Sequence, residues 1–212
     1  MYTNHIDEFD WFLKTNDDSF IILENLRHML FQYETDWPLV IGQRFLKEVL
    51  LSPFRFYNFL TNRSQKDYMI GDYVLSKRAF NRLLEDAFTN PEICKNSASD
   101  DDQAVAECLE HINVLKIDGV DEKNRGRFFR NNPESALFPE KLDDYDKWYW
   151  TKLKQGIENC CSDKLIALQN FRDTHLYYLE YFIYKVHTFG RQRLPEHLPQ
   201  KLSLEQIIKN NY

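Results

Sequence analysis

A short apolar run, an acidic turn and an amphipathic run follow one another near the start of the sequence. Residues 9–13 (FDWFL) are apolar and few enough for a buried strand. Residues 15–19 are turn-forming. Apolar residues then recur at helical spacing up to about residue 32, at Ile22, Leu26, Met29 and Leu30. A strand that turns directly into an amphipathic helix favours a layered fold built from both elements.

The same alternation continues along the chain. Strands are predicted at 38–42, 72–76 and 112–117. Ser76 is a good N-cap for a helix over 77–88, another helix begins at residues 100–102, and a third carries Leu179, Phe182, Ile183 and Val186. Ser203 and Gln206 resemble a capping box, and residues 118–147 are predicted to form a long surface loop. The sequence therefore predicts an α/β domain with a mixed sheet flanked by helices.

Composition and charge exclude several classes of protein. The chain has 212 residues, of which 43% are hydrophobic, enough for one domain with a core. A formal net charge of -6 argues against a nucleic-acid partner, which would select a basic surface. The sequence has no apolar run of the roughly 18 residues that a membrane span requires, so no span is expected in this chain.

The four cysteines suggest an oxidising compartment without fixing their pairing. Cys94 and Cys108 could close a local loop there. The adjacent pair Cys160 and Cys161 is expected to face separate partners, because neighbouring cysteines seldom bridge each other. The absence of a C-x-x-C motif argues against a zinc ribbon or a thioredoxin-type site.

Two acidic stretches have two interpretations each. The turn Asn16-Asp17-Asp18 and the run at residues 100–102 both precede predicted helices. Carboxylates there bind a divalent cation in some proteins, and in others only complement the helix dipole and the turn. Residue types and spacing alone favour the second interpretation for both stretches.

A longer set of motifs resembles a known family. The segment "DWFLKTNDDSFIILENLRHML" is followed by "YVLSKRAF" (73–80), "SDDDQAVAECLEHINV" (99–114), "WYW" (148–150), "CCSD" (160–163) and "LEYFIYKVHTFG" (179–190). In this order they resemble the core 1 β1,3-galactosyltransferases, or T-synthases, of the β3-galactosyltransferase superfamily. The resemblance covers most of the chain.

The resemblance implies a fold, a reaction and a location. Residues 1–212 would form a single, partial GT-A (Rossmann-like) glycosyltransferase domain that lacks the N-terminal part of the nucleotide-binding half. Family members transfer galactose from UDP-galactose to O3 of N-acetylgalactosamine on Ser or Thr, with inversion and with Mn²⁺ as cofactor. They are Golgi membrane proteins, and homodimers are known among them. The implied partners are thus UDP-galactose, a GalNAc-bearing glycoprotein and a second copy of the chain.

Matching positions carry the family's roles onto particular residues of this sequence. Asn16, Asp17 and Asp18 fall on the donor-binding DxD motif, with Asp18 as metal ligand and Asn16 where an Asp is expected. Gln169 stands where the family has a His that is a plausible metal ligand. Asp101 and Asp102 match the positions where the family's general base is expected, and Asp102 is slightly favoured. Trp148 and Trp150 match positions where aromatic rings could bind the acceptor sugar, and packing in the core is an equally good alternative for them.

The departures from the family support a second hypothesis. Asn16 contributes no charge, Gln169 is a weaker ligand than His, and the family's glycine-rich stretch before Tyr73 is shortened to "MIGD". The chain also begins just before the predicted DxD strand. A weakened enzyme is therefore expected, and the alternative is an inert homologue that acts as a chaperone-like binding partner of an active synthase.

Overall fold

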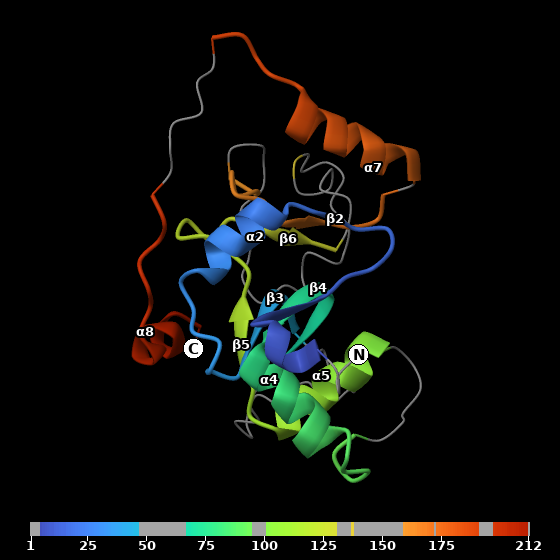
Figure 1. Cartoon of the computed structure of the whole chain (residues 1–212), viewed down its shortest axis with the longest axis vertical. Helices are drawn as coiled ribbons and strands as arrows, with labels where there is room; N and C mark the ends of the chain where they lie inside the picture. The colour runs from blue at the N-terminus through green and yellow to red at the C-terminus, as the bar shows by residue number, and fades with distance from the viewer. Residues whose placement is uncertain are drawn as a thin grey trace, which may run out of the picture.

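The computed structural model describes residues 5–46, 67–94, 101–130, 137, 159–171, 173–190 and 197–211 (Figure 1). Its strands are β1 (Trp11–Lys14), β2 (Phe20–Ile21), β3 (Leu39–Leu46), β4 (Asp67–Ser76), β5 (Leu115–Asp118), β6 (Phe128–Phe129) and β7 (Ala167–Leu168). Its α-helices are α2 (Leu23–Leu30), α4 (Lys77–Arg82), α5 (Asp101–His111), α7 (Asp173–Glu180) and α8 (Leu204–Asn211). Short helical turns are η1 (Ile6–Glu8), η2 (Leu83–Ala87) and η5 (Tyr181–Lys185), the last two of them π-helical. The predicted α/β class is confirmed.

Two sheets organise these elements. The larger sheet has the strand order β1-β4-β3-β5, in which β5 runs parallel to β3 and the other pairs are antiparallel. The smaller sheet has the order β2-β7-β6, with β2 antiparallel and β6 parallel to β7. Because β1 and β2 belong to different sheets, the turn that joins them crosses from one sheet to the other.

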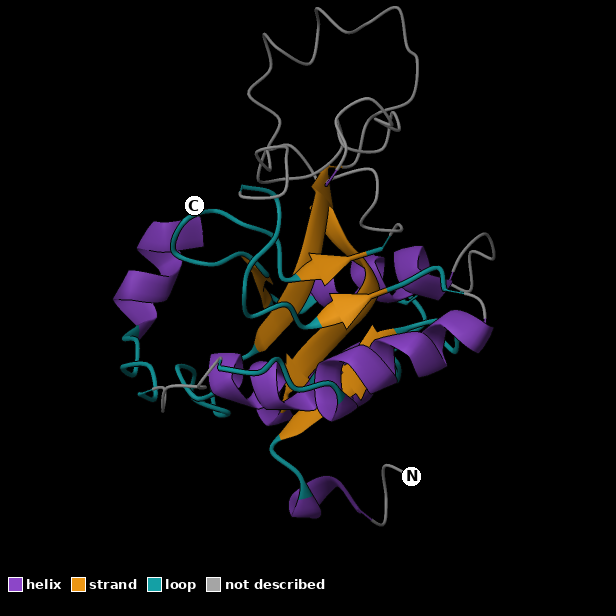
Figure 2. Ribbon diagram, turned by 90° about the horizontal axis from the view of Figure 1, so that it is seen from above, coloured by secondary structure: helices purple, strands orange, loops and turns teal. Residues whose placement is uncertain are grey.

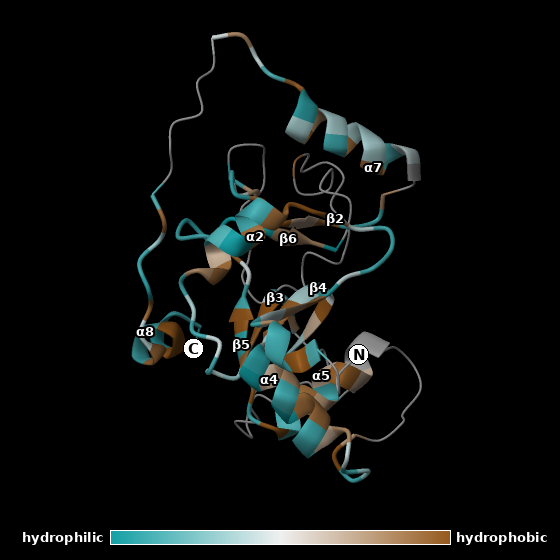
Figure 3. Ribbon diagram, viewed as in Figure 1, coloured by the Kyte–Doolittle hydropathy of each residue, from teal (hydrophilic) through white to brown (hydrophobic). Residues whose placement is uncertain are grey.

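The larger sheet packs against a hydrophobic core on each face, and helices lie around it in the view from above (Figure 2). On β3, Leu39 and Ile41 face a core with α2, the smaller sheet and α8. Val40 faces the opposite core with α4, η2 and α5. All three side chains are fully buried, and each contributes about 1.5–3 kcal/mol to folding. The helices alternate hydrophobic and hydrophilic residues around these cores (Figure 3).

Ser76 joins three elements at the end of β4. Its hydroxyl oxygen accepts hydrogen bonds from the backbone N–H of Ala79 (3.2 Å) and of Leu39 (3.0 Å), and its O–H donates to the carbonyl of Trp37. The predicted N-cap is therefore confirmed. The capping box before α8 is confirmed as well, since Ser203 N–H donates to Gln206 Oε1 at 2.8 Å and Gln206 N–H to Ser203 Oγ at 3.3 Å.

Buried charges fasten α8 to the larger sheet. Arg44 is only 1% exposed and pairs with Asp67, while its Nη1 donates to the carbonyl of Asn211 at 3.1 Å. Lys116 donates to the Asp67 carbonyl at 2.6 Å, and the Asp118 N–H donates to Asn211 Oδ1 at 3.3 Å. Arg44 and Lys116 thus each have a partner for their buried charge. None of the described helices has both the length and the apolar composition needed to cross a bilayer.

The first part of the predicted surface loop at 118–147 is buried instead. Arg127, Phe128 and Phe129 are each at most 5% exposed, and the two phenylalanines form β6. The preceding turn is built on Asp121, whose carboxylate accepts from Arg125 Nε at 2.7 Å. Burial raises the pKa of Asp121, but hydrogen bonds from Arg125, Ser162 and Lys123 together outweigh it and hold that pKa below its ordinary value.

The cysteines form two disulfides. Cys94 and Cys108 are bonded, as the sequence allowed. Cys160 and Cys161 are bonded to each other, so the expectation of separate partners was wrong. Cys160 is fully buried in a small apolar cluster with Phe129 and Leu168.

The late helix is present, although only part of its predicted apolar face is covered. Leu179 and Ile183 are half-buried, whereas Phe182 is 65% exposed. Tyr184 donates its O–H to Glu24 Oε2 at 2.7 Å and so ties η5 to α2. Burial, followed by this hydrogen bond, raises the pKa of Tyr184 to about 12.

Candidate functional site

The acidic turn lies between the two sheets. β1 ends at Lys14, β2 begins at Phe20, and the Ser19 N–H closes the turn on the Asn16 carbonyl at 3.3 Å. Asp17 is exposed, while Asp18 is half-buried. The turn therefore presents one carboxylate to solvent and one toward the interior.

A bulge in β4 faces this turn. Gly42 of β3 pairs with Tyr73 and Arg44 pairs with Met69, so residues 70–72 of β4 stand opposite the single residue Gln43. Gly71 has a φ of +78°, a left-handed conformation that glycine adopts without strain. A bulge re-aims the side chains it contains. Here it directs Asp72 toward the Asn16–Ser19 turn.

Asp72 holds the turn through one carboxylate oxygen. Its Oδ1 accepts from Ser19 Oγ at 2.9 Å and from the Asn16 N–H at 3.3 Å, and the residue is only 4% exposed. Lys14 completes the link, because its Nζ donates to Asn16 Oδ1 at 2.9 Å and to the Gly71 carbonyl at 3.1 Å. The turn is thus fixed to the β4 bulge from both sides.

Gln169 reaches the same place from the smaller sheet. It follows β7, its backbone N–H donates to the Phe129 carbonyl, and the side chain is 2% exposed. A Cβ on Gly71 would lie 2.6 Å from Gln169 Oε1, so the amide packs directly against the bulge. The backbone N–H of Phe171 donates to the Asp18 carbonyl at 3.3 Å. The structure therefore brings Gln169 and the acidic turn together, as the sequence match predicted.

Three buried polar atoms of this region lack hydrogen-bond partners among the described residues. They are Asp18 Oδ1, Asp72 Oδ2 and Gln169 Nε2, and these three residues are here named the polar cluster. An unpaired buried polar atom costs about 1–3 kcal/mol, and more when it is charged. A bound ligand that supplied partners would remove this cost.

The oxygen atoms of the polar cluster suit a hard divalent cation whose remaining ligands come from a bound substrate. Carboxylate and amide oxygens suit Mn²⁺ and Mg²⁺. Among the described residues, no three His, Cys, Asp or Glu side chains are grouped to hold a metal by themselves. Cations of this kind are commonly held by one or two carboxylates together with substrate phosphates. The polar cluster thus fits a cation that arrives with a phosphorylated substrate.

The other predicted site residues lie at or beyond the limits of the description. Asp101 and Asp102 are the first two residues of α5, as predicted, but their side chains lie outside the described part. Trp148 and Trp150 lie outside the described residues altogether. Their roles remain predictions.

Asp72 was not among the predicted site residues. The signal was present in the sequence, because a carboxylate stands beside a glycine inside the apolar strand "MIGDYVL" (69–75). A buried charge in a strand interior requires a partner or a ligand.

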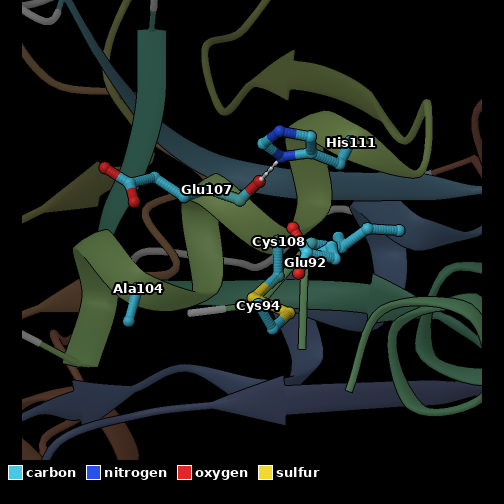
Figure 4. A pocket seen from close by; sticks show the side chains of 7 residues that line it. Glu92, Cys94, Ala104, Glu107, Cys108 and His111 are labelled. Atoms are coloured by element: carbon cyan, nitrogen blue, oxygen red, sulfur yellow. Dashed lines mark hydrogen bonds between the residues drawn. A yellow bond between two sulfur atoms is a disulfide. The ribbon is translucent and has the colours of Figure 1, made fainter. Parts of the chain in front are cut away.

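A hollow of about 230 Å³ lies apart from the acidic turn, beside the Cys94–Cys108 disulfide (Figure 4). His111 and Glu107 line it, and His111 Nδ1 lies 2.7 Å from the Glu107 carbonyl oxygen. Ligand pockets usually measure about 300–1,000 Å³, so this hollow is small for a nucleotide sugar.

Comparison with known proteins agrees with the motifs. The family model described as Fringe-like matches residues 1–122. The chain is also 32% identical over 193 residues to glycoprotein-N-acetylgalactosamine 3-beta-galactosyltransferase 1 of Xenopus laevis. That alignment covers 89% of this chain and 49% of the relative, so the chain spans about half the length of this curated relative. The predicted family resemblance is confirmed.

Proposed function

The chain belongs to the Fringe-like family, and we propose that it moves galactose from UDP-galactose to O3 of N-acetylgalactosamine linked to Ser or Thr. The similarity supports a glycosyltransferase of the Fringe and β3-glycosyltransferase kind, and the mixed sheet flanked by helices is consistent with a GT-A domain. The observation that carries the proposal is the polar cluster beside the Asn16–Ser19 turn, where the family's DxD motif falls.

The donor would bind at this turn. Asp18 Oδ1 would hold Mn²⁺, and the buried Gln169 amide would contribute from the opposite sheet. The cation would neutralise charge that builds on the departing UDP. Asn16 and the exposed Asp17 would contact the nucleotide, and the Lys14 ammonium beside Asn16 adds a positive charge for the diphosphate. With Asn16 neutral, the donor site carries less negative charge than a full D-D-D motif, and the cation should bind more weakly.

The acceptor hydroxyl would be deprotonated by a carboxylate at the start of α5. We propose Asp102, with Asp101 as the alternative, as the group that takes the O3 proton. The bond from O3 to galactose C1 forms on the face opposite the leaving UDP, the bond from C1 to UDP breaks, and the configuration inverts. Trp148 and Trp150 would stack on the acceptor sugar.

A transfer assay tests this proposal. The chain is incubated with UDP-galactose, Mn²⁺ and a peptide that carries GalNAc, and NMR identifies the linkage of the product. The chain is expected to form a β1,3 linkage, and Asp102→Asn to lower kcat by about 100- to 10,000-fold while UDP binding is retained. Asp101→Asn is assayed in the same way, because Asp101 is the alternative candidate for the general base. Absence of transfer in the wild type would contradict the enzymatic proposal.

A second candidate function follows from the substitutions at the metal site. Asn16 and Gln169 both replace stronger family ligands, which favours an inert binding partner of an active synthase. Co-purification of the chain with an active synthase, without transfer by the chain itself, would support this alternative. In either case we propose a secretory or Golgi lumenal location, because the two disulfides require an oxidising compartment, and a homodimer by family resemblance.

A further inference from the structure

Asp72 is a buried carboxylate with one oxygen in use and one unpaired. We propose that Asp72 is a second carboxylate ligand of the divalent cation held by Asp18, and so offsets the charge absent at Asn16. This inference rests on the proposed function, because it concerns the same donor site. It assigns a ligand from β4, outside the acidic turn.

The β4 bulge gives Asp72 its position. Three residues of β4, 70–72, stand opposite one residue of β3, and Gly71 adopts a φ of +78°. As a result Asp72, which would otherwise continue the strand, hydrogen-bonds to the turn that carries Asp18. Asp18 therefore belongs to the four-residue turn that Asp72 holds.

The two oxygens of Asp72 have different environments. Oδ1 accepts from Ser19 Oγ and from the Asn16 N–H, and this alone would fix the turn. Oδ2 is buried and has no hydrogen-bond partner among the described residues. An asparagine could hold the turn equally well through its amide oxygen. The hydrogen bonds to the turn therefore do not require the negative charge of Asp72.

The neighbours of Oδ2 favour a cation. Asp18 Oδ1 is unpaired in the same region, and together the two carboxylates carry the charge that a divalent cation balances. The Gln169 amide is packed against Gly71, and a half-turn about its last bond presents oxygen in place of nitrogen. Lys14 donates to Asn16 Oδ1 at 2.9 Å and to the Gly71 carbonyl at 3.1 Å. One cation would then be bound by Asp18 Oδ1, Asp72 Oδ2 and the oxygen of the rotated Gln169 amide.

Direct measurement of Mn²⁺ binding tests the inference without any activity assay. Mn²⁺ is titrated, first alone and then with UDP present, into the wild type, Asp72→Asn and Asp18→Asn, with free Mn²⁺ followed by electron paramagnetic resonance. Asp72→Asn keeps an acceptor for Ser19 and for the Asn16 N–H, so it separates charge from turn geometry. Loss of groups around a metal typically weakens binding by about 10- to 100-fold, and we expect at least this increase in Kd for both variants.

Thermal unfolding supplies an independent reading. In the absence of Mn²⁺, Asp72→Asn should unfold at a temperature equal to or above that of the wild type, because it removes a buried carboxylate whose Oδ2 has no hydrogen-bond partner among the described residues. Addition of Mn²⁺ should raise the Tm of the wild type and leave that of Asp72→Asn nearly unchanged. The matched control Asp36→Asn removes an exposed carboxylate on another turn and should behave as the wild type.

The outcomes separate this inference from the proposed function. If Asp18→Asn loses Mn²⁺ while Asp72→Asn keeps the wild-type Kd, Asp72 only supports the turn and the inference fails, although the donor site stands. If Ser19→Ala, which removes one hydrogen bond to Oδ1, weakens Mn²⁺ binding as much as Asp72→Asn, the effect is geometric and the inference also fails. If the wild type binds no Mn²⁺, both proposals fail.

Discussion

Replacement of Gly71 by alanine should destabilise the protein for two separable reasons. Gly71 has a φ of +78°, and the left-handed conformation costs a residue with a Cβ about 1–2 kcal/mol. The new Cβ would also lie 2.6 Å from Oε1 and 2.9 Å from Nε2 of Gln169, closer than such atoms approach. Gln169 is 2% exposed and must move within a packed interior, which adds roughly 1–2 kcal/mol. We expect Gly71→Ala to cost about 2–4 kcal/mol in all.

A second glycine provides a matched control for this prediction. Gly190 also has a φ of +78°, but a Cβ there meets nothing within 4 Å. Gly190→Ala should therefore show only the backbone cost of about 1–2 kcal/mol. Urea denaturation followed by circular dichroism gives the free energy of unfolding for each variant.

Truncation of Gln169 isolates the steric part. In a Gln169→Ala background the clash is removed, so Gly71→Ala should cost only as much as Gly190→Ala. A coupling of about 1–2 kcal/mol between positions 71 and 169 is the expected result, within the range found for residues in contact. If Gly71→Ala costs the same with glutamine or alanine at position 169, the packing of Gln169 against the bulge is refuted.

Two further predictions concern other parts of the fold. Ser76→Ala should lower the free energy of unfolding by about 1–3 kcal/mol, because it removes a buried helix cap and the hydrogen bonds to Trp37 and Leu39. Ser203→Ala, at the exposed cap of α8, should lower it by only about 0.5–1 kcal/mol. Equal losses in the two variants would contradict the argument from burial. The hydrogen bond from Tyr184 to Glu24 should persist below the ordinary tyrosine pKa of 10.0 and be lost as pH rises through about 12, because the pKa of Tyr184 is raised in the folded state. Hydrogen exchange of the η5 amides should therefore increase between these two pH values in the wild type. Tyr184→Phe should remove this pH dependence.

Sequence patterns predicted the regular elements well. Apolar runs placed β1, α2 and β3 within a few residues, and the serine at position 76 marked a helix start that the structure confirms. These elements were predictable because each has a continuous periodic face or a cap with a defined hydrogen bond.

The smaller sheet was not predicted, for a physical reason. β2, β6 and β7 contain two residues each, which is too short to show any periodicity. The polar composition of residues 118–147 predicted a surface loop, but tertiary partners bury residues 126–129. Pairing between β2 and β7 is what brings Gln169 to the acidic turn, and it joins segments nearly 150 residues apart.

The candidate site was predicted in part. Family motifs selected Asp18 and Gln169, and the fold places them together. Asp72 was not predicted because its position depends on the β-bulge in β4. The bulge is defined by the pairing of β4 with β3, and the sequence of β4 alone does not show it.

Calorimetric titration of the chain with UDP, with and without Mn²⁺, tests the central claim most directly. The wild type and Asp36→Asn should bind UDP in a Mn²⁺-dependent manner, and Asp18→Asn should lose that dependence. UDP binding that is absent from the wild type in both conditions, or that Asp18→Asn retains with the same Mn²⁺ dependence, would contradict a donor site at the acidic turn.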